Sequence, residues 1–263
     1  MKNAAHSADR VPICYEVRGA GFPSLIFVHG WSCDRRYWIR QLDHFAQKYQ
    51  VVAIDLAGHG ESASGRQAWT MPAFGKDVAA VVEKLRPKKV VLIGHSMGGD
   101  VVVEAARRLR DRVVGLVWVD TYFRLGSPRT KNEVDAFMAP LRRDFVTGVR
   151  ALARGMFLPH SEAKLVDWVV ADMSAAPPDV ALAAVEKAIT FEPEILVGLR
   201  ELEIPKAVIN GKWRPTDIDC LERYGFEVVV MSDVGHFPMM EAPERFNRIL
   251  SGLIEGFLEV QSA

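Results

Sequence analysis

The sequence predicts an α/β fold with a mostly parallel central sheet and helices on both faces. Short runs rich in Val, Ile and Leu, flanked by turn residues, recur through the first half of the chain. Segments in which apolar residues have helical spacing separate these runs. Runs that are apolar on both faces are typical of strands covered on both sides. Because strand and helix alternate, we expect the strands to pair in parallel.

The same patterns predict the individual elements. The expected strands are 13–18, 24–28, 51–54, 90–93, 113–119, 206–210 and 227–231, and the expected helices are 38–48, 71–85, 98–109 and 243–258. The helix at 71–85 has a start signal, because Thr70 can cap it and Pro72 fits its first turn. We expect 13–18 to be an edge strand and the residues around His6 to fray.

The alternation of strand and helix stops after Asp120. Between 122 and 199 there is no strong strand run, six prolines divide the segment into helical pieces, and large apolar side chains are frequent. This predicts a helical cap at 122–199, inserted into a core made of 1–121 and 200–263. The apolar side chains of the cap either complete the core or line a pocket.

The charge balance limits the expected partners. The chain of 263 residues has 33 basic and 33 acidic side chains, so its formal net charge is zero. Binding to nucleic acid or to anionic lipid needs a basic face. We therefore expect no nucleic-acid or membrane partner, and instead a small, largely uncharged substrate. The chain is expected to act as a monomer or homodimer.

The cysteines and the apolar runs predict where the protein resides. The three cysteines lie far apart and in no ligand pattern, which predicts free thiols. No apolar run approaches 18 residues, and the first nine residues lack a signal-peptide core. A cytoplasmic location is the expectation.

The most informative motif is GHSMGG at 94–99, a G-x-S-x-G sequence between an expected strand and an expected helix. A turn sharp enough to present the serine hydroxyl crowds the positions two before and two after it, and glycine fits such positions best. Ser96 is therefore the candidate nucleophile. The alternative is a glycine-rich turn with an incidental serine.

A serine nucleophile needs a histidine to take its proton and an acid to orient that histidine. His236, in DVGHF at 233–237, follows the last expected strand and lies at the same sheet edge as Ser96. Ligands bind at this edge in parallel α/β sheets. His29 and His59 lie in loops at the same edge, where we expect them to pack the loops, and His29 is also a candidate substrate contact.

Four motifs in this order resemble the α/β-hydrolase superfamily. They are FVHGW at 27–31, like the oxyanion turn, DLAGHGES at 55–62, like the D-x-x-G-x-G-x-S loop, GHSMG at 94–98, like the nucleophile elbow, and GHF at 235–237, like the histidine loop. The resemblance extends from about Ile13 to the C-terminal helix. It implies Ser96 as nucleophile, His236 as base, and the backbone N–H groups of Trp31 and Met97 as oxyanion hole. A helix start at Met97 also favours negative charge.

The triad acid departs from the usual family pattern. Many members carry an aspartate in a G-x-x-D turn after the strand that here ends at Asn210, but GKWR at 211–214 has Arg214 at that position. Asp120, after the strand at 113–119, and Asp217 remain candidates. We favour Asp120, because a strand end holds a side chain more firmly than a loop containing proline does. Asp219 is a weaker third candidate.

The expected function is a serine hydrolase that cleaves a small or medium, largely uncharged carboxylic ester through an acyl-enzyme. The candidate substrate contacts are His29, Phe123, Phe137, Trp168 and Phe237. Lactone hydrolysis, C–C bond hydrolysis, perhydrolysis and cofactor-free oxygenation stay open, because one scaffold hosts many reactions. A ligand-binding sensor with little turnover is the alternative from another class. No metal or organic cofactor is expected, because the histidines lack ligand spacing and no G-x-G-x-x-G follows a strand.

Overall fold

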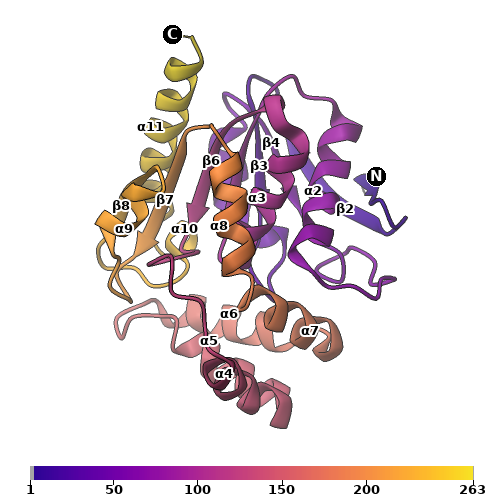
Figure 1. Cartoon of the computed structure of the whole chain (residues 1–263), viewed down its shortest axis with the longest axis vertical. Helices are drawn as coiled ribbons and strands as arrows, with labels where there is room; N and C mark the ends of the chain where they lie inside the picture. The colour runs from indigo at the N-terminus through magenta and orange to yellow at the C-terminus, as the bar shows by residue number, and fades with distance from the viewer. Residues whose placement is uncertain (1–2, 263) are drawn as a thin grey trace.

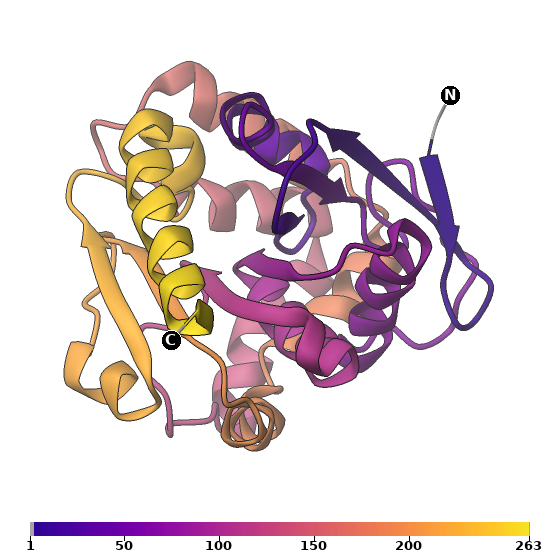
Figure 2. The same cartoon turned by 90° about the horizontal axis from the view of Figure 1, so that it is seen from above.

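An eight-stranded sheet forms the centre of the computed structural model, which describes residues 3–262 (Figure 1). Across the sheet the strands are β1 (Asn3–His6), β2 (Pro12–Arg18), β4 (Gln50–Ile54), β3 (Ser24–Val28), β5 (Val90–His95), β6 (Val113–Val119), β7 (Lys206–Gly211) and β8 (Phe226–Met231). Strand β2 pairs antiparallel with both β1 and β4, and all other neighbours pair in parallel. Figure 2 shows the N-terminal strands and β8 at opposite edges. The predicted α/β class with a mostly parallel sheet is confirmed.

Helices cover both faces of this sheet. One face carries α2 (Met71–Leu85), α3 (Met97–Leu109) and α8 (Glu192–Glu201), and the other carries α1 (Ile39–Phe45) and α11 (Pro243–Ser262). The remaining helical elements are short 3₁₀ turns at Arg35–Trp38 and Arg110–Arg112 and the helices α4 (Lys131–Arg143), α5 (Phe145–Arg154), α6 (Ala163–Ser174), α7 (Pro178–Ala188), α9 (Ile218–Arg223) and α10 (Pro238–Glu241). Helices α4 to α7 gather beyond one end of the sheet, at the bottom of Figure 1.

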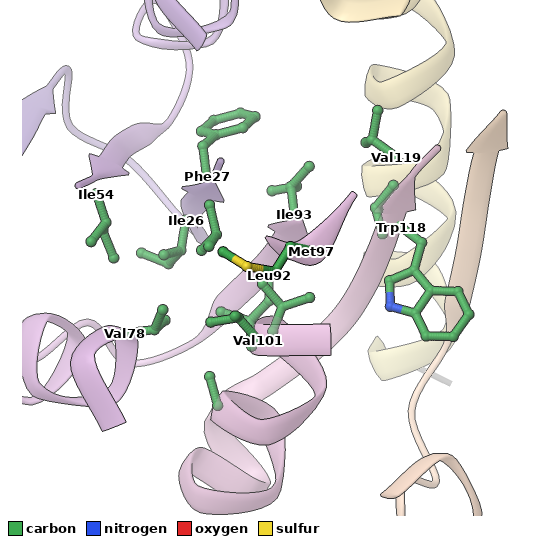
Figure 3. Close-up of a cluster of buried hydrophobic side chains, with 14 of the residues drawn as sticks. Ile26, Phe27, Ile54, Val78, Leu92, Ile93, Met97, Val101, Trp118 and Val119 are labelled. Atoms are coloured by element: carbon green, nitrogen blue, oxygen red, sulfur yellow. The ribbon is translucent and has the colours of Figure 1, made fainter. Parts of the chain in front are cut away.

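The core forms because the central strands are apolar on both faces. Every residue of β3 and β6 is buried. Successive side chains of a strand point to opposite faces, and Figure 3 shows this for β3: Ile26 points toward α2 and α3, whereas Phe27 points the other way. The ring of Phe27 lies 5.1 Å from that of Trp38, measured between centroids.

Two expectations for the N-terminal region were wrong. The residues around His6 do not fray but form β1, which pairs with β2, so β2 is not an edge strand. The short, polar sequence NAAH gives no strand pattern, and its backbone pairing depends on the neighbouring strand. A separate difference concerns the helix expected at 38–48, which spans only Ile39–Phe45. A 3₁₀ turn at Arg35–Trp38 precedes it, where the Asp34 side chain accepts a hydrogen bond from the Arg36 N–H, and Ala46 caps its C-terminus.

The register of β5 and β6 brings Ser96 and Asp120 to the same edge of the sheet. His95 pairs with Val119, so the residues that follow them leave the sheet side by side. The Ser96 N–H donates to the Val119 carbonyl over 2.9 Å. Ser96 and Asp120 both have positive φ, 51° and 52°, so the chain turns sharply at both positions. A functional site is therefore expected at this edge of the sheet.

Among the helices of residues 3–262, none combines the length and the apolar composition that crossing a bilayer requires.

The elbow after β5 predicts a strong requirement for glycine at position 94. A Cβ on Gly94 would lie 2.2 Å from the Gly98 carbonyl oxygen, a backbone atom that cannot move away alone. We expect Gly94→Ala to lower the free energy of unfolding by about 2 kcal/mol, as overpacking does. Urea unfolding measures this. Gly65→Ala is the control, because no atom lies within 4 Å of the added Cβ. Equal unfolding midpoints for the two variants would contradict the steric account.

Candidate active site

Ser96 sits in a strained turn between β5 and α3. Its backbone has φ 51° and ψ −122°, a combination that L-residues rarely adopt. The turn is tight on both sides. A Cβ on Gly98 would lie 2.6 Å from the carbonyl oxygens of Val28 and His29, and a Cβ on Gly94 would lie 2.2 Å from the carbonyl oxygen of Gly98. The two glycines of the motif are therefore required by close backbone approach.

The turn after β3 packs against this elbow. A Cβ on Gly30 would lie 3.2 Å from the Ser96 Cβ. The backbone N–H groups of Trp31 and Met97 have no hydrogen-bond acceptor among the described residues, and both residues line a cavity together with Ser96. The Trp31 indole donates to the Ala181 carbonyl over 2.8 Å, which ties this turn to α7. Unpaired amides beside a serine hydroxyl can bind an oxyanion.

The carboxylate of Asp120 accepts three hydrogen bonds. Its Oδ1 accepts from the Gly211 N–H over 2.6 Å, and its Oδ2 accepts from the Trp213 indole over 2.7 Å and from His236 Nδ1 over 2.5 Å. Asp120 is buried, so these three donors replace water around its charge. Because Nδ1 carries the proton that it donates to Asp120, Nε2 is the ring atom of His236 that can accept one.

The backbone of His236 is held on both sides. Its N–H donates to the Met156 carbonyl over 2.9 Å, and its carbonyl accepts from His95 Nε2 over 2.8 Å. The Trp213 ring meets the His236 ring edge-on, with 5.3 Å between centroids. Trp213 therefore positions both the carboxylate and the imidazole.

The three candidate acids have different places in the fold. Asp217 caps α9, where its side chain accepts from the Cys220 N–H over 3.1 Å, and it is largely exposed. Asp219 is also exposed. Of the three candidates, only Asp120 has a hydrogen bond to His236 within the described residues.

A cavity of about 390 Å³ adjoins Ser96 and His236. Its walls come from the elbow, the loop after β6, the helices α4, α5 and α7, and the turn after β7. Apolar side chains form much of this wall: Trp31, Met97, Phe123, Phe137, Leu152, Met156, Val185, Ala188, Ile189 and Trp213. Phe123 and Phe137 therefore line the cavity, as residues that contact the substrate must.

Three of the five expected substrate contacts do not line this cavity. His29 is fully buried: its Nε2 accepts from the Leu56 N–H over 3.0 Å, and its Nδ1 donates to the Gly30 carbonyl over 2.8 Å. Trp168, on α6, packs instead on Tyr37, with 4.9 Å between ring centroids. Phe237 is fully buried and stacks on Phe157. Aromatic or loop position alone did not indicate which way these side chains point.

Several residues that line the cavity were not among the site residues expected from the sequence. Asp100, in the first turn of α3, lines the cavity and accepts a hydrogen bond from the Tyr122 hydroxyl over 3.0 Å. Burial raises the pKa of Asp100 well above its usual value, and the charges of Glu192 and Glu104 raise it further. One feature of the sequence could have indicated Trp213: it lies in the GKWR turn, where many members of the family carry the triad acid.

Within residues 3–262, no three His, Cys, Asp or Glu side chains are arranged to hold a metal ion.

The alpha/beta hydrolase family model matches residues 25–249. The chain belongs to this family.

Relatives and solved structures agree with this assignment. The dihydrolipoyllysine-residue acetyltransferase component of the acetoin cleaving system of Pseudomonas putida is 29% identical over 243 residues, which cover 89% of this chain and 64% of that protein. This chain therefore spans less than two thirds of that relative. A thermophilic esterase from Thermogutta terrifontis has a TM-score of 0.84 and 26% identity, covering 98% of this chain and 99% of the other. An esterase from Exiguobacterium antarcticum has a TM-score of 0.86 at 19% identity, covering 97% and 100%, and shows the shared fold.

The burial of His29 predicts a specific pH dependence of stability. Desolvation lowers the pKa of His29 from 6.5 to about 4. Between these values the unfolded chain binds a proton that the folded chain does not, so the free energy of unfolding falls as pH falls through this window. We expect His29→Gln to reduce that slope by up to about 1.4 kcal/mol per pH unit.

Urea unfolding at several pH values between about 4 and 6.5 measures this slope. His44→Gln is the matched control, because His44 is exposed on α1. A slope for His29→Gln that equals the wild-type slope would contradict a neutral, structural His29.

Proposed function

We propose that the protein hydrolyses carboxylic esters with Ser96 as nucleophile, His236 as general base and Asp120 as the acid that orients it. The observation that carries the proposal is the 2.5 Å hydrogen bond between Asp120 Oδ2 and His236 Nδ1, at a cavity that Ser96 and His236 both line. This combination of groups supplies nucleophile, base and orienting acid in one place.

In the acylation step, the Ser96 hydroxyl attacks the ester carbonyl carbon while His236 Nε2 takes the hydroxyl proton. The imidazolium that forms is stabilised by Asp120. The carbonyl oxygen becomes an oxyanion, which the N–H groups of Trp31 and Met97 bind. The start of α3 at Met97 adds the positive end of a helix dipole. Collapse of the tetrahedral intermediate breaks the ester C–O bond, and His236 returns its proton to the leaving alcohol.

In the deacylation step, His236 takes a proton from water, and the hydroxide attacks the acyl carbon of the acyl-enzyme. The same two N–H groups bind the second oxyanion. When the intermediate collapses, the Ser96 oxygen leaves and takes the proton from His236. The products of this step are the carboxylic acid and the free enzyme, and the reaction needs no cofactor.

The cavity supports a small or medium ester. Its volume of about 390 Å³ lies at the lower end of the usual range for small-molecule sites, and much of its wall is apolar. The 26% identity to the Thermogutta terrifontis esterase over nearly the whole chain supports ester hydrolysis as the reaction class.

The nucleophile is tested by turnover of 4-nitrophenyl butyrate, followed by release of 4-nitrophenol. We expect Ser96→Ala to lower kcat by at least about 10³-fold, because no other group replaces the serine. Full activity of this variant would overturn the proposal. A ligand-induced rise in Tm in a wild-type protein without turnover of any ester would favour a sensor.

The acid is tested by a pair of matched variants. Asp120→Asn keeps the shape of the side chain but removes the charge that stabilises the imidazolium, so kcat on 4-nitrophenyl butyrate should fall by about 10²- to 10⁴-fold. Asp217→Asn should keep near wild-type kcat, because asparagine caps a helix as well as aspartate does. A large loss in Asp217→Asn, with Asp120→Asn folded and active, would reverse the assignment.

A further inference from the structure

One side of the cavity next to Ser96 is basic. Arg129, from the loop after β6, and Arg214, from the turn after β7, both line it, and both side chains are also accessible to solvent. The other charged side chains that line the cavity are Asp100, Asp120, Arg124, Glu192 and His236. Three arginines thus face a space that also holds the proposed nucleophile.

Aromatic rings of the cavity wall hold the two arginines in place. The Arg129 guanidinium carbon lies 5.5 Å from the centroid of Phe137, and that of Arg214 lies 4.2 Å from the centroid of Trp213. Cation–π contacts of this kind stabilise an arginine over a ring. The position of Trp213 is itself fixed, because its indole donates to Asp120. Arg214 is therefore tied to the triad acid through one side chain.

Neither Arg129 nor Arg214 forms an ion pair with any carboxylate among the described residues, whereas Arg124 lies 3.9 Å from Asp217. Partial desolvation and the facing charge of Arg129 lower the pKa of Arg214. The charge of Asp120 opposes this shift but lies outside ion-pair distance. An anion placed between the two like charges is therefore favourable.

Two acidic side chains of the wall come from elements other than those that carry Arg129 and Arg214. Asp100 lies on α3 and is bonded to the Tyr122 hydroxyl, and Glu192 lies on α8, where it accepts from the Ser127 N–H over 2.9 Å. Both are buried. A negative group on a ligand is attracted to the arginine side, and this attraction sets the orientation of the ligand in the cavity.

We propose that the cavity binds an ester that also carries a free carboxylate, and that Arg129 and Arg214 bind this carboxylate. The planar guanidinium matches the two oxygens of a carboxylate. The ester part of the inference rests on the proposed function, whereas binding of the carboxylate does not. The proposal departs from the uncharged substrate that the zero net charge predicted, because the charges are segregated within the cavity.

Calorimetric titration of the Ser96→Ala protein tests the proposal without turnover. The probes are monoethyl glutarate, which is an anion at neutral pH, and ethyl pentanoate, its neutral analogue with an acyl chain of equal length. We expect the anion to bind about tenfold more tightly or better, and the preference to shrink as salt is added. It should disappear in Ser96→Ala/Arg129→Gln/Arg214→Gln. Ser96→Ala/Arg150→Gln is the control, because Arg150 is exposed and outside the cavity wall, and it should keep the preference.

Equal affinity of the Ser96→Ala protein for the two probes at low salt would overturn the inference, whether or not the wild type turns over esters. A preference that survives in the double-arginine variant would overturn the role of these arginines. The salt titration needs no arginine variant, so it tests the electrostatic preference for the anion even if those variants fail to fold, and the single variants Ser96→Ala/Arg129→Gln and Ser96→Ala/Arg214→Gln then test the two arginines separately. If the anion binds more tightly but wild type hydrolyses neither probe, the carboxylate site stands and the proposed function fails.

Discussion

The carboxylate of Asp120 joins the end of β6 to two segments that lie 91 to 93 and 116 residues later in the sequence. It accepts from the Gly211 N–H at the end of β7, from the Trp213 indole in the turn after it, and from the His236 ring in the loop after β8. A buried carboxylate without such donors would cost several kcal/mol. One side chain at the end of β6 therefore fixes both the turn after β7 and the ring of His236.

The histidines around this centre have different electrostatic roles. Desolvation lowers the pKa of His29 to about 4 and that of His59 to about 3, so both are neutral hydrogen-bonding groups beneath the sheet edge. Desolvation, followed by the neighbouring His236, also lowers the pKa of His95. Neutral neighbours add no positive charge beside His236, as the proposed role of His236 as a base requires. The free cations of the site lie instead on the arginine side of the cavity.

The sequence was sufficient to predict the sheet, and it also predicted that Asp120 and His236 lie together, for physical reasons. Strands such as β3 and β6 are buried on both faces, and this burial appears directly as continuous apolar runs. Asp120 was predictable because the end of a parallel strand places a side chain at the ligand-binding edge. The strand β1 was missed because NAAH has no pattern of its own.

The substrate contacts were harder to predict, because apolarity does not reveal the direction of a side chain. Trp168 packs on Tyr37 and Phe237 on Phe157, away from the cavity that Phe123 and Phe137 line. Trp213 was missed for a related reason: its indole matters through a hydrogen bond to a residue 93 positions earlier, which no local pattern contains. The arginine in the GKWR turn suggested a lost acid, whereas in the structure Asp120 after β6 accepts the hydrogen bond from His236 and Arg214 lines the cavity.

The most direct test of the account is covalent labelling with an alkyl fluorophosphonate, which reacts with a serine that a neighbouring base has activated. Intact-mass and peptide-mass measurements give the number and the position of the adducts. The account predicts one adduct, on Ser96, and a labelling rate that falls sharply in His236→Ala. An adduct on another residue, or an unlabelled Ser96 in a protein that still hydrolyses esters, would contradict it.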